Sequence, residues 1–416
     1  MTAESELQIF TLNCWGIPVI SNDRLGRFKA IAEVLGGGKY DLVCLQEVWD
    51  TQDYFFLKKC LQQVLPFSHY FYSGVLGSGL CVFSKFPFQD VFFHQWSLNG
   101  YVHKIQHGDW FGGKGIGLCT LKIRDMTVNL YTAHLHAEYD RTNDEYLSHR
   151  VLQAFDTAQF VRLTSKNCDL VILGGDLNTE PSDLSYRILC SEAQLEDAFV
   201  HAGNIPEDCI GTNESERNSY SDNRKLQLNP RGKRIDYVLF RTGPSVQLKK
   251  INYGLPLPPR VPSCSFSYSD HEAVSASVTL SRNTGVEESS SYKIDAALHK
   301  QALNEGLLVC NEALQKLARD KYFYWIASCT LFLVLLSICS TSPPYEMHSL
   351  YKIFLSVISA LMCFTGFMCF IWNRMEVNGI MAGKLAMELA CSKCQGEVGE
   401  ESSSKAGLFE EGSKFS

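Results

Sequence analysis

Two apolar stretches near the end of the 416-residue chain constrain its fold more than any other feature. Residues 322–340 (YFYWIASCTLFLVLLSICS) carry no charge, and residues 350–372 (LYKIFLSVISALMCFTGFMCFIW) carry one lysine close to their start. A hydrocarbon core about 30 Å thick is crossed by roughly 20 helical residues. Each stretch is therefore long enough to span a bilayer, and the short loop 341–349 between them predicts a hairpin. Buried core helices are the alternative, which the length of the stretches disfavours.

The charges that flank this hairpin predict its orientation. The loop 341–349 contains no lysine or arginine, whereas basic residues stand on both outer flanks. Because cytosolic flanks carry the excess of positive charge, both termini and the large N-terminal region are expected in the cytosol, with the loop in the lumen. The basic flanking residues are Lys316, Arg319, Lys321, Arg374 and Lys384.

The large region, 1–281, alternates apolar strand-like runs with helical patterns and Gly/Asn/Asp turns. Helical patterns occupy 24–35 and 145–165. Strands hydrophobic enough to be covered, interrupted by helices, predict an α/β (α+β) sandwich of two sheets flanked by helices. We expect this region to be one catalytic domain.

The remaining segments have distinct compositions. Residues 282–292 (RNTGVEESSSY) are polar and read as a linker. Residues 293–321 form a predicted juxtamembrane amphipathic helix, which packs on the domain, lies on the membrane surface, or forms a dimer seam through 303–317. Residues 373–416 form a predicted cytosolic tail with a disordered end. The leucine-rich face comprises Leu303, Leu307, Cys310, Leu314 and Leu317.

Net charge and cysteine content narrow the class of protein. The formal charge of −7 is opposite to that of a domain built to hold a nucleic-acid backbone. The 16 cysteines are scattered, and the N-terminus shows no basic segment followed by an apolar one. We therefore expect reduced thiols on the cytosolic side and no secretory signal.

Polar residues stand repeatedly at the ends of apolar strand-like runs. In LGGDLN (173–178) an apolar run stops at two glycines, followed by Asp176 and Asn178. Such a set of carboxylates, carboxamides and imidazoles suits Mg²⁺, or Mn²⁺ in its place, with histidine left to move protons. Each residue alone has a structural explanation as a turn, cap or buried imidazole. The other members are Asn13, Glu47, His134, Asp236, Asp270 and His271.

The spacing within LGGDLN suggests how its polar residues share one target. Positions two apart on a strand point to the same side, so Asp176 and Asn178 are expected to face one bound phosphate. The glycine pair is expected to let the backbone turn sharply there.

The order of these motifs over about 8–281 resembles the endonuclease/exonuclease/phosphatase superfamily, which has the DNase-I-like fold and cleaves phosphate esters with Mg²⁺. The resemblance implies that Glu47 binds the metal directly, with Asn13 and Asp270 beside it. It also implies that His271, oriented by Asp236, is the general base. Asp176 and Asn178 would contact the nucleophile and a phosphate oxygen, and His134 would lie beside the scissile phosphate. His136 has no matching role.

Longer motifs are similar to the neutral sphingomyelinases, in the type with two membrane spans after the catalytic domain. They are LNCWGIP, SGVLGSGLCVFSKFPF, LNGY, HGDWFGGKGIGL and TAHLHAEY. This resemblance implies phospholipase-C-type hydrolysis of sphingomyelin to ceramide and phosphocholine, with lyso-phosphocholine lipids as further substrates. It implies the endoplasmic reticulum or nuclear envelope as the location. The bilayer is a partner, and a homodimer through 303–317 or the membrane helices is a further expectation.

The glycine-rich stretch HGDWFGGK adds candidate substrate contacts. Trp110 and Phe111 either touch lipid and cup a quaternary ammonium by cation–π contact, or lie buried under the loop. Asp109 and Lys114 are expected to pair across the loop, and Lys114 to stabilise phosphate charge.

Two other activities fit the same core motifs. A phosphoinositide phosphatase should show a basic pocket, for which RGKR at 231–234 is the candidate cluster. A nuclease of the same fold should have a positive face and no membrane spans.

Overall fold

The structure is a computed structural model that describes residues 4–203, 205, 209–282, 295–341 and 347–411, with side chains to residue 394. It divides into two compact units, Met1–Ala302 and Leu303–Ser416. Most of the predicted linker 282–292 and half of the predicted loop 341–349 lie outside the described residues.

Unit 1 is built on two six-stranded sheets. Most neighbouring strands are antiparallel, but β1 pairs with β2 and β7 with β8 in parallel. The first sheet has the order β11 (Val246–Gly254), β12 (Val274–Arg282), β1 (Ser5–Asn13), β2 (Leu42–Gln46), β4 (Cys81–Ser84) and β3 (Phe67–Tyr70). The second has the order β5 (Phe88–Gln95), β6 (Gly115–Ile123), β7 (Met126–His134), β8 (Leu170–Asp176), β10 (Asp236–Thr242) and β9 (Glu196–Asp197).

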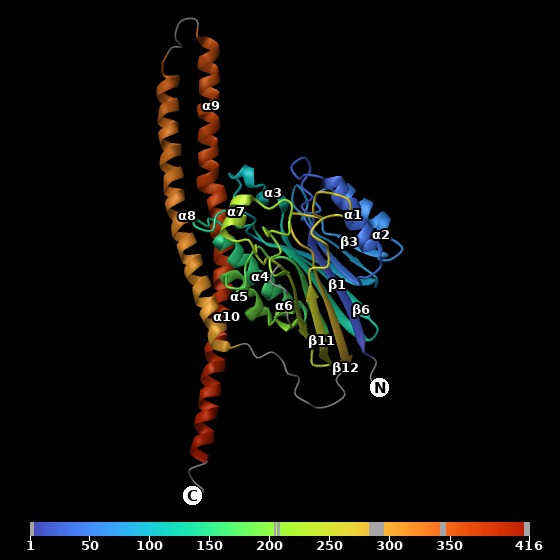
Figure 1. The fold of residues 1–416 in the computed structure, drawn as a ribbon. Coiled ribbons are helices and arrows are strands. Elements are labelled where there is room, and N and C mark those ends of the chain that lie inside the picture. Colours follow the sequence, from blue (N-terminus) through green and yellow to red (C-terminus); the bar gives the residue numbers. More distant parts are fainter. Residues whose placement is uncertain (1–3, 204, 206–208, 283–294, 342–346, 412–416) are drawn as a thin grey trace. The chain divides into compact units, whose positions relative to one another are not determined.

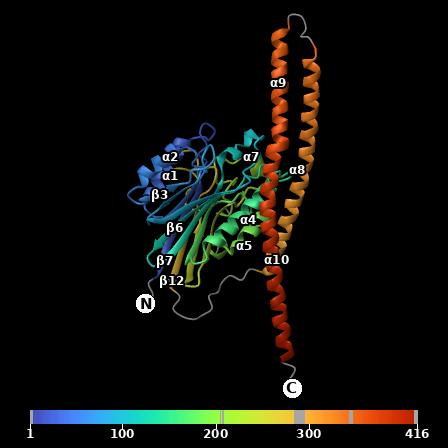
Figure 2. The ribbon, with the colours of Figure 1, turned by 180° about the vertical axis from the view of Figure 1, so that it is seen from behind.

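Helices cover the outer faces of the two sheets (Figure 1 and, from behind, Figure 2). α1 (Arg24–Gly36) and α2 (Thr51–Leu61) pack on the first sheet, and α4 (Leu147–Thr164) and α5 (Leu184–Ala193) on the second. The predicted two-sheet sandwich with flanking helices is confirmed. Short helices lie in the connections: η1 (Ile105–His107), α3 (Asp109–Gly112), α6 (Ala198–His201) and α7 (Asn223–Leu228).

The strand period of two explains where the core ends and polar chemistry begins. In β1, Leu7 and Ile9 join the core between the sheets, while Phe10 and Leu12 pack towards α1. Every second residue of a strand faces the space between the sheets. At one edge of the sandwich, the last inward-facing residue of several strands is polar. These inward end residues are Asn13 on β1, His134 on β7, Asp176 on β8 and Asp236 on β10.

Unit 2 consists of long helices. α8 (Ala296–Cys339) enters it from unit 1, and α9 (His348–Phe367), the π-helical turn η3 (Met368–Trp372) and α10 (Asn373–Glu411) follow. By length and composition, the described residues contain two helices apolar enough to cross a membrane. Leu303, Cys310 and Leu317 of the predicted amphipathic face are buried, and Asn373 donates a hydrogen bond to the Leu317 carbonyl.

Candidate active site

Strand register gathers the predicted site residues at one edge of unit 1. In the second sheet, Asp176 pairs with His134 on one side and with Asp236 on the other. In the first sheet, the parallel pairing of β1 and β2 sets Asn13 against Gln46, one residue before Glu47. Five strands from distant parts of the sequence therefore carry polar residues to the same edge.

Asn13 joins the two sheets at this edge. Its Nδ2 donates to Asp176 Oδ2 at 2.9 Å and to Glu47 Oε1 at 3.2 Å. Its Oδ1 accepts from the backbone N–H of Trp15 at 3.0 Å. Asn13 thus donates to one buried carboxylate, Asp176, and one half-buried carboxylate, Glu47, and links them.

His271 forms a buried pair with Asp236. Its Nδ1 lies 2.9 Å from Asp236 Oδ2, and its Nε2 lies 3.8 Å from Asp176 Oδ2. Burial alone would lower the pKa of His271, but the Asp236 and Asp176 carboxylates outweigh it and raise the pKa well above the ordinary value. With Nδ1 occupied, Nε2 is the nitrogen left to exchange a proton.

His134 has the opposite electrostatics. It is buried, with Nε2 3.4 Å from Asp176 Oδ2 and 3.9 Å from Glu47 Oε1. Burial, and next the positive charge of Lys114, hold its pKa well below the ordinary value. His134 is therefore neutral at physiological pH and has one N–H to donate.

Glu47 and Asp270 are two neighbouring, half-buried acids. Burial, followed by the charge of Asp270, raises the pKa of Glu47 to about 7, and burial raises the pKa of Asp270. Glu47 Oε2 is buried with no hydrogen-bond partner in the described structure. A divalent cation fits these residues, because it would neutralise the two acids and occupy the unpaired oxygen.

A second set of possible metal ligands lies next to Glu47 and Asp270. Ligand atoms of Asp176, Asp236 and His271 all come within 4.8 Å of one another, so this triad could also hold a metal ion. The hydrogen bond between Asp236 and His271 accounts for much of that proximity. The unpaired oxygen of Glu47 makes Glu47 the better anchor for a cation.

The prediction of how Asp176 and Asn178 face one target is wrong in its geometry. β8 ends at Asp176, and Asn178 has a left-handed backbone with φ 46°. A turn rather than strand alternation brings them together: the Asn178 N–H donates to Asp176 Oδ1 at 2.9 Å. The Asn178 side chain donates to the Leu135 carbonyl at 3.0 Å.

The expected sharp turn at the glycine pair is also wrong. Gly174 and Gly175 lie within β8, paired with β10. Their role is close approach: a Cβ on Gly175 would lie 2.1 Å from the Ala133 carbonyl oxygen. The missing side chains let β8 sit tightly between β7 and the first sheet.

The predicted ion pair across the glycine-rich loop is confirmed. Lys114 Nζ lies 2.8 Å from Asp109 Oδ1, and both side chains are buried. Asp109 also accepts a hydrogen bond from the Tyr139 hydroxyl and lies 3.5 Å from His136 Nε2. Lys114 donates to the Leu135 carbonyl at 3.3 Å, the same oxygen that Asn178 contacts, so the ammonium and the Asn178 amide are neighbours.

Trp110 and Phe111 lie on the loop above this pair. Trp110 is exposed, Phe111 is half-buried, and their rings meet edge to face at 5.1 Å. The Phe111 carbonyl accepts hydrogen bonds from Val75 and Leu76. The Trp110 side chain is thus available at the surface, while the backbone of Phe111 ties this loop to residues 75–76.

Sequence reasoning missed Arg27, which ties two site segments together. It is fully buried and donates to the carbonyls of Cys14 and Trp15 at 2.6 and 2.8 Å, and to that of Tyr268 at 3.4 Å. The sequence did offer one indication of this role: Arg27 stands on the apolar face of the helical pattern 24–35, one turn before Ile31. Thr212 was also missed: its hydroxyl accepts from the Asp236 N–H at 3.1 Å, and no motif marks it.

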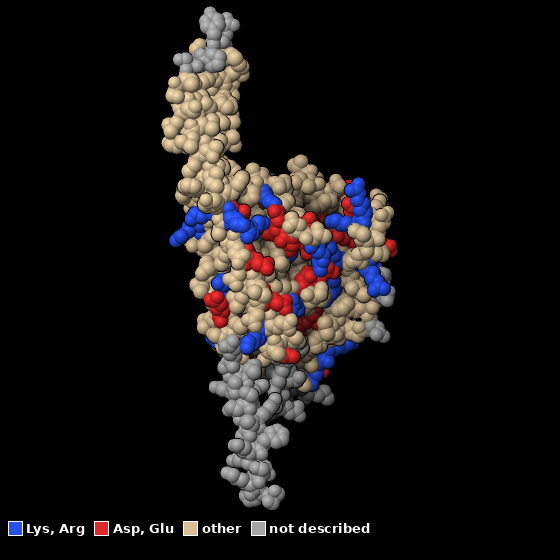
Figure 3. Space-filling model, turned by 90° about the vertical axis from the view of Figure 1, so that its left-hand side faces the viewer, with Lys and Arg blue, Asp and Glu red and all other residues tan. Residues whose placement is uncertain are grey.

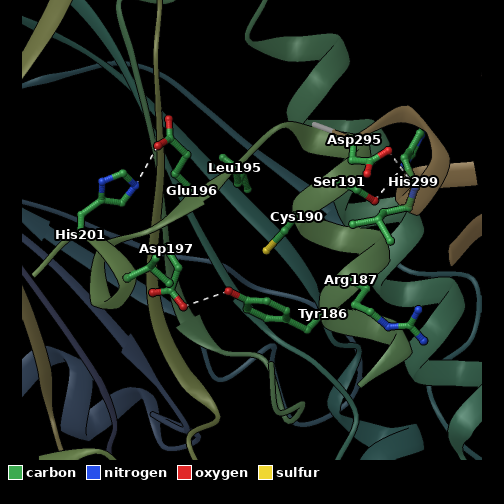
Figure 4. Close-up of a pocket in the computed structure, with 12 residues that line it drawn as sticks. Tyr186, Arg187, Cys190, Ser191, Leu195, Glu196, Asp197, His201, Asp295 and His299 are labelled. Atoms are coloured by element: carbon green, nitrogen blue, oxygen red, sulfur yellow. Dashed lines mark hydrogen bonds and ion pairs between the residues drawn. The ribbon is translucent and has the colours of Figure 1, made fainter. Parts of the chain in front are cut away.

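A separate cavity of about 400 Å³ lies beside α5 and the segment 195–201 (Figure 4). None of the predicted site residues lines it. Its acids are engaged locally: Asp197 accepts from the Tyr186 hydroxyl, and Glu196 pairs with His201. The predicted site residues therefore gather at the edge between the sheets, apart from this cavity.

Comparisons with known proteins identify the family and the fold. The sequence model of the endonuclease/exonuclease/phosphatase family matches residues 10–271. A "Putative neutral sphingomyelinase" of Drosophila melanogaster is 41% identical, over 94% of this chain and 98% of its own length. "Sphingomyelin phosphodiesterase 2" of Mus musculus is 41% identical, over 68% of this chain and 67% of its own. A mutant of beta toxin from Staphylococcus aureus, solved with bound magnesium ions, has the same fold, with a TM-score of 0.50 and 18% identity over 65% of this chain and 99% of that one.

Proposed function

Since the chain belongs to the endonuclease/exonuclease/phosphatase family, and within it to the neutral sphingomyelinases, we propose that it hydrolyses sphingomyelin to ceramide and phosphocholine. The reaction is of the phospholipase C type, with water attacking phosphorus in line with the ceramide oxygen. Lyso-phosphocholine lipids are further candidate substrates.

The observation that carries the proposal is the His271–Asp236 pair beside Asp176. Asp236 holds Nδ1 of His271, so Nε2 accepts the proton of the attacking water. The water oxygen bonds to phosphorus, and the bond from phosphorus to the ceramide oxygen breaks. Asp176, 3.8 Å from Nε2, is placed to orient the water.

Three groups can stabilise the charge on the phosphate oxygens. His134 is neutral and donates one N–H. Asn178 would donate, without adding charge, the amide N–H that is not bonded to the Leu135 carbonyl and that contacts Asp176 Oδ2 at 3.4 Å. Lys114 contributes a positive charge next to Asn178, since both reach the Leu135 carbonyl. These three come from the end of β7, the turn after β8 and the residue before β6.

We propose Mg²⁺ as the cofactor, with Mn²⁺ able to replace it, held by Glu47 with Asp270 beside it. Asn13 orients both Glu47 and Asp176 rather than offering an oxygen, because its Oδ1 is engaged by Trp15. The bound cation supplies Lewis-acid stabilisation of the phosphate and of the leaving oxygen. The magnesium ions of the structural neighbour support this choice.

The substrate reaches the site in a membrane to which the chain is tied. The apolar helices suit a membrane anchor, and the positive flanks favour a cytosolic catalytic unit. The resemblance to the neutral sphingomyelinases is the reason to propose the endoplasmic reticulum or nuclear envelope as the membrane. Tethering keeps lipid at high effective concentration. A homodimer through 303–317 or the membrane helices remains a prediction.

Charge distribution disfavours the two alternative activities. On the face drawn in Figure 3, acidic and basic side chains are intermixed. The RGKR segment offers little to several phosphates, because Arg234 is buried against Asp197 at 2.7 Å and Lys233 lies 3.3 Å from Glu138. A phosphoinositide phosphatase or a nuclease would need such cations exposed.

One assay separates these activities. Full-length protein in detergent with Mg²⁺ is incubated with sphingomyelin, a phosphoinositide or nicked DNA, and products are identified by mass spectrometry. We expect ceramide and phosphocholine, lost on chelation and restored by Mg²⁺. Glu47→Gln is the inactive control. Release of inorganic phosphate from the phosphoinositide, with sphingomyelin untouched, would refute the proposal.

A further inference from the structure

Five large aliphatic side chains stand exposed on three loops of unit 1. Val19 is completely exposed, Val75 is 77% exposed and Ile105 71% exposed. We call the set the apolar rim. Isolated exposed apolar residues are ordinary, but a group of them around one site marks an interaction surface. The members of the rim are Val19, Ile20, Val75, Leu76 and Ile105.

Topology places all three loops at the edge that carries the site. The first loop leaves β1 directly after Asn13. The second, 71–80, joins β3 to β4; because Leu45 pairs with Cys81, it lies at the Glu47 end of β2. The third, 96–114, enters β6, and the pairing of Ile116 with Ala133 sets it at the His134 end of β7. α3, within the third loop, marks this edge in Figure 1.

The loops are fixed to one another and to Glu47. The N–H groups of Val75 and Leu76 donate to the Phe111 carbonyl at 3.0 and 3.1 Å. Trp49, two residues after Glu47, lies so close under both loops that a Cβ on Gly79 or Gly112 would come within 3.3 or 3.1 Å of its ring. On the other side, the Gly16 N–H donates to the Glu47 carbonyl. The rim therefore has a set position relative to the site.

The backbone of Val19 suggests that the first loop has a functional role. Its φ of 70° is left-handed, a conformation that β-branched residues rarely adopt. No packing of the side chain offsets this strain, because the side chain is completely exposed. Backbone strain of this kind persists at functional positions where the surrounding structure holds it.

Lysine and arginine side chains on these loops, and Arg24 directly after the first loop, are already paired within the unit. Arg24 lies 2.6 Å from Asp53, Lys104 pairs with Glu145, and Lys114 is buried against Asp109. The edge thus presents aliphatic tips without free positive charge from these residues. Hydrophobic insertion, rather than attraction to anionic lipid, is the interaction that such a surface supports.

We propose that the apolar rim docks unit 1 on the bilayer, with the aliphatic tips in the region between headgroups and acyl chains. This rests on the proposed function, since a lipid keeps its chains in the bilayer and offers only its headgroup. Docking by loops on both sides of Glu47 holds the site open towards that surface. The membrane helices keep the unit nearby, and the rim sets its orientation.

The test uses the full chain reconstituted in phosphatidylcholine–sphingomyelin vesicles. The rim variant carries Val19→Asn, Ile20→Ser, Val75→Ser and Leu76→Ser; asparagine tolerates the left-handed backbone. The control is Leu163→Ser, similarly exposed at the end of α4, which leads into the opposite end of β8. Turnover is measured on vesicle sphingomyelin and on a monomeric, water-soluble short-chain phosphocholine ester.

We expect the rim variant to lose about tenfold or more on vesicles, at low and high salt alike, and to keep its rate on the soluble ester. The control keeps both rates. Equal losses on both substrates, or no loss on vesicles, would overturn the docking role. Failure of the unmodified protein to cleave either substrate would instead refute the proposed function.

A second measurement does not depend on the folding of the rim variant. A photo-crosslinking amino acid at Val75 should capture phospholipid in the vesicles, whereas the same group at Leu163 should not. Capture of a membrane protein at Val75 in native membranes, without lipid, would overturn the proposal in favour of a protein partner.

Discussion

The two sides of the site hold histidines that the fold has made opposites. His271 faces Asp236 and Asp176, and its pKa is raised; His134 lies near Lys114, and its pKa is lowered. Both are buried, so burial alone would depress both pKa values. Burial is the largest cause of the lowered pKa of His134, whereas at His271 the two carboxylates outweigh burial. This difference underlies the proposal that His271 accepts a proton and that His134 donates a hydrogen bond.

The largest effect is expected for His271→Ala. Loss of the base should lower kcat by about 10³- to 10⁴-fold, near the upper end for general base catalysis. Turnover of sphingomyelin and the melting temperature of the purified full chain are measured together. His94→Gln, at a half-exposed histidine paired with Asp156, serves as the control. Retention of a tenth of the activity by the alanine variant would contradict the role of base.

Asp236→Asn tests the origin of the raised pKa. The Asp236 carboxylate favours the protonated imidazole, so its removal lowers the pKa of His271. The base is then free at lower pH, and the acidic limb of the kcat/KM profile should move to lower pH. The plateau should fall about 10²-fold or more, because Nδ1 is no longer held. A limb that stays in place or moves to higher pH would show that another group controls it.

His134→Asn tests whether His134 and His271 have different effects on the pH profile. Loss of one hydrogen bond to the phosphate costs about 10²-fold in kcat. The acidic limb should stay close to its wild-type position, since His134 is neutral throughout that range. If the acidic limb of the kcat/KM profile moved as far as in Asp236→Asn, the two histidines would titrate together. The contrast drawn between His134 and His271 would then be wrong.

The smallest effect on kcat is expected for the buried pair Asp109–Lys114. Asp109→Lys and Lys114→Asp should each lower the free energy of unfolding by about 3 kcal/mol, because a buried charge is left unpaired. Combining them should recover much of that stability, measured by urea unfolding.

The rate behaves differently in the exchanged variant. It should stay about tenfold below wild type, since a carboxylate replaces the ammonium beside Asn178. The same exchange at the partly exposed i,i+4 pair Lys384–Glu388 of α10 is the control, and little change is expected there. Full recovery of the rate would show that Lys114 acts only through Asp109.

Much of the architecture followed from local pattern. Apolar stretches of 19 and 23 residues predicted the two long apolar helices, and alternating apolar runs with two helical patterns predicted the flanked sandwich. α1 and α4 begin and end within two residues of the patterns at 24–35 and 145–165. Such patterns are local, so periodicity is enough to read them.

The sequence by itself determined which residue types end each strand, and the family motifs named the site among them. Tertiary structure alone decided how they meet: Asn13 spans two sheets, Arg27 joins segments more than 200 residues apart, and Asn178 reaches its place by a left-handed turn. It also decided the opposite pKa shifts of His134 and His271 and the clustering of the apolar rim. These features depend on contacts between segments distant along the chain, which a local residue pattern does not reveal.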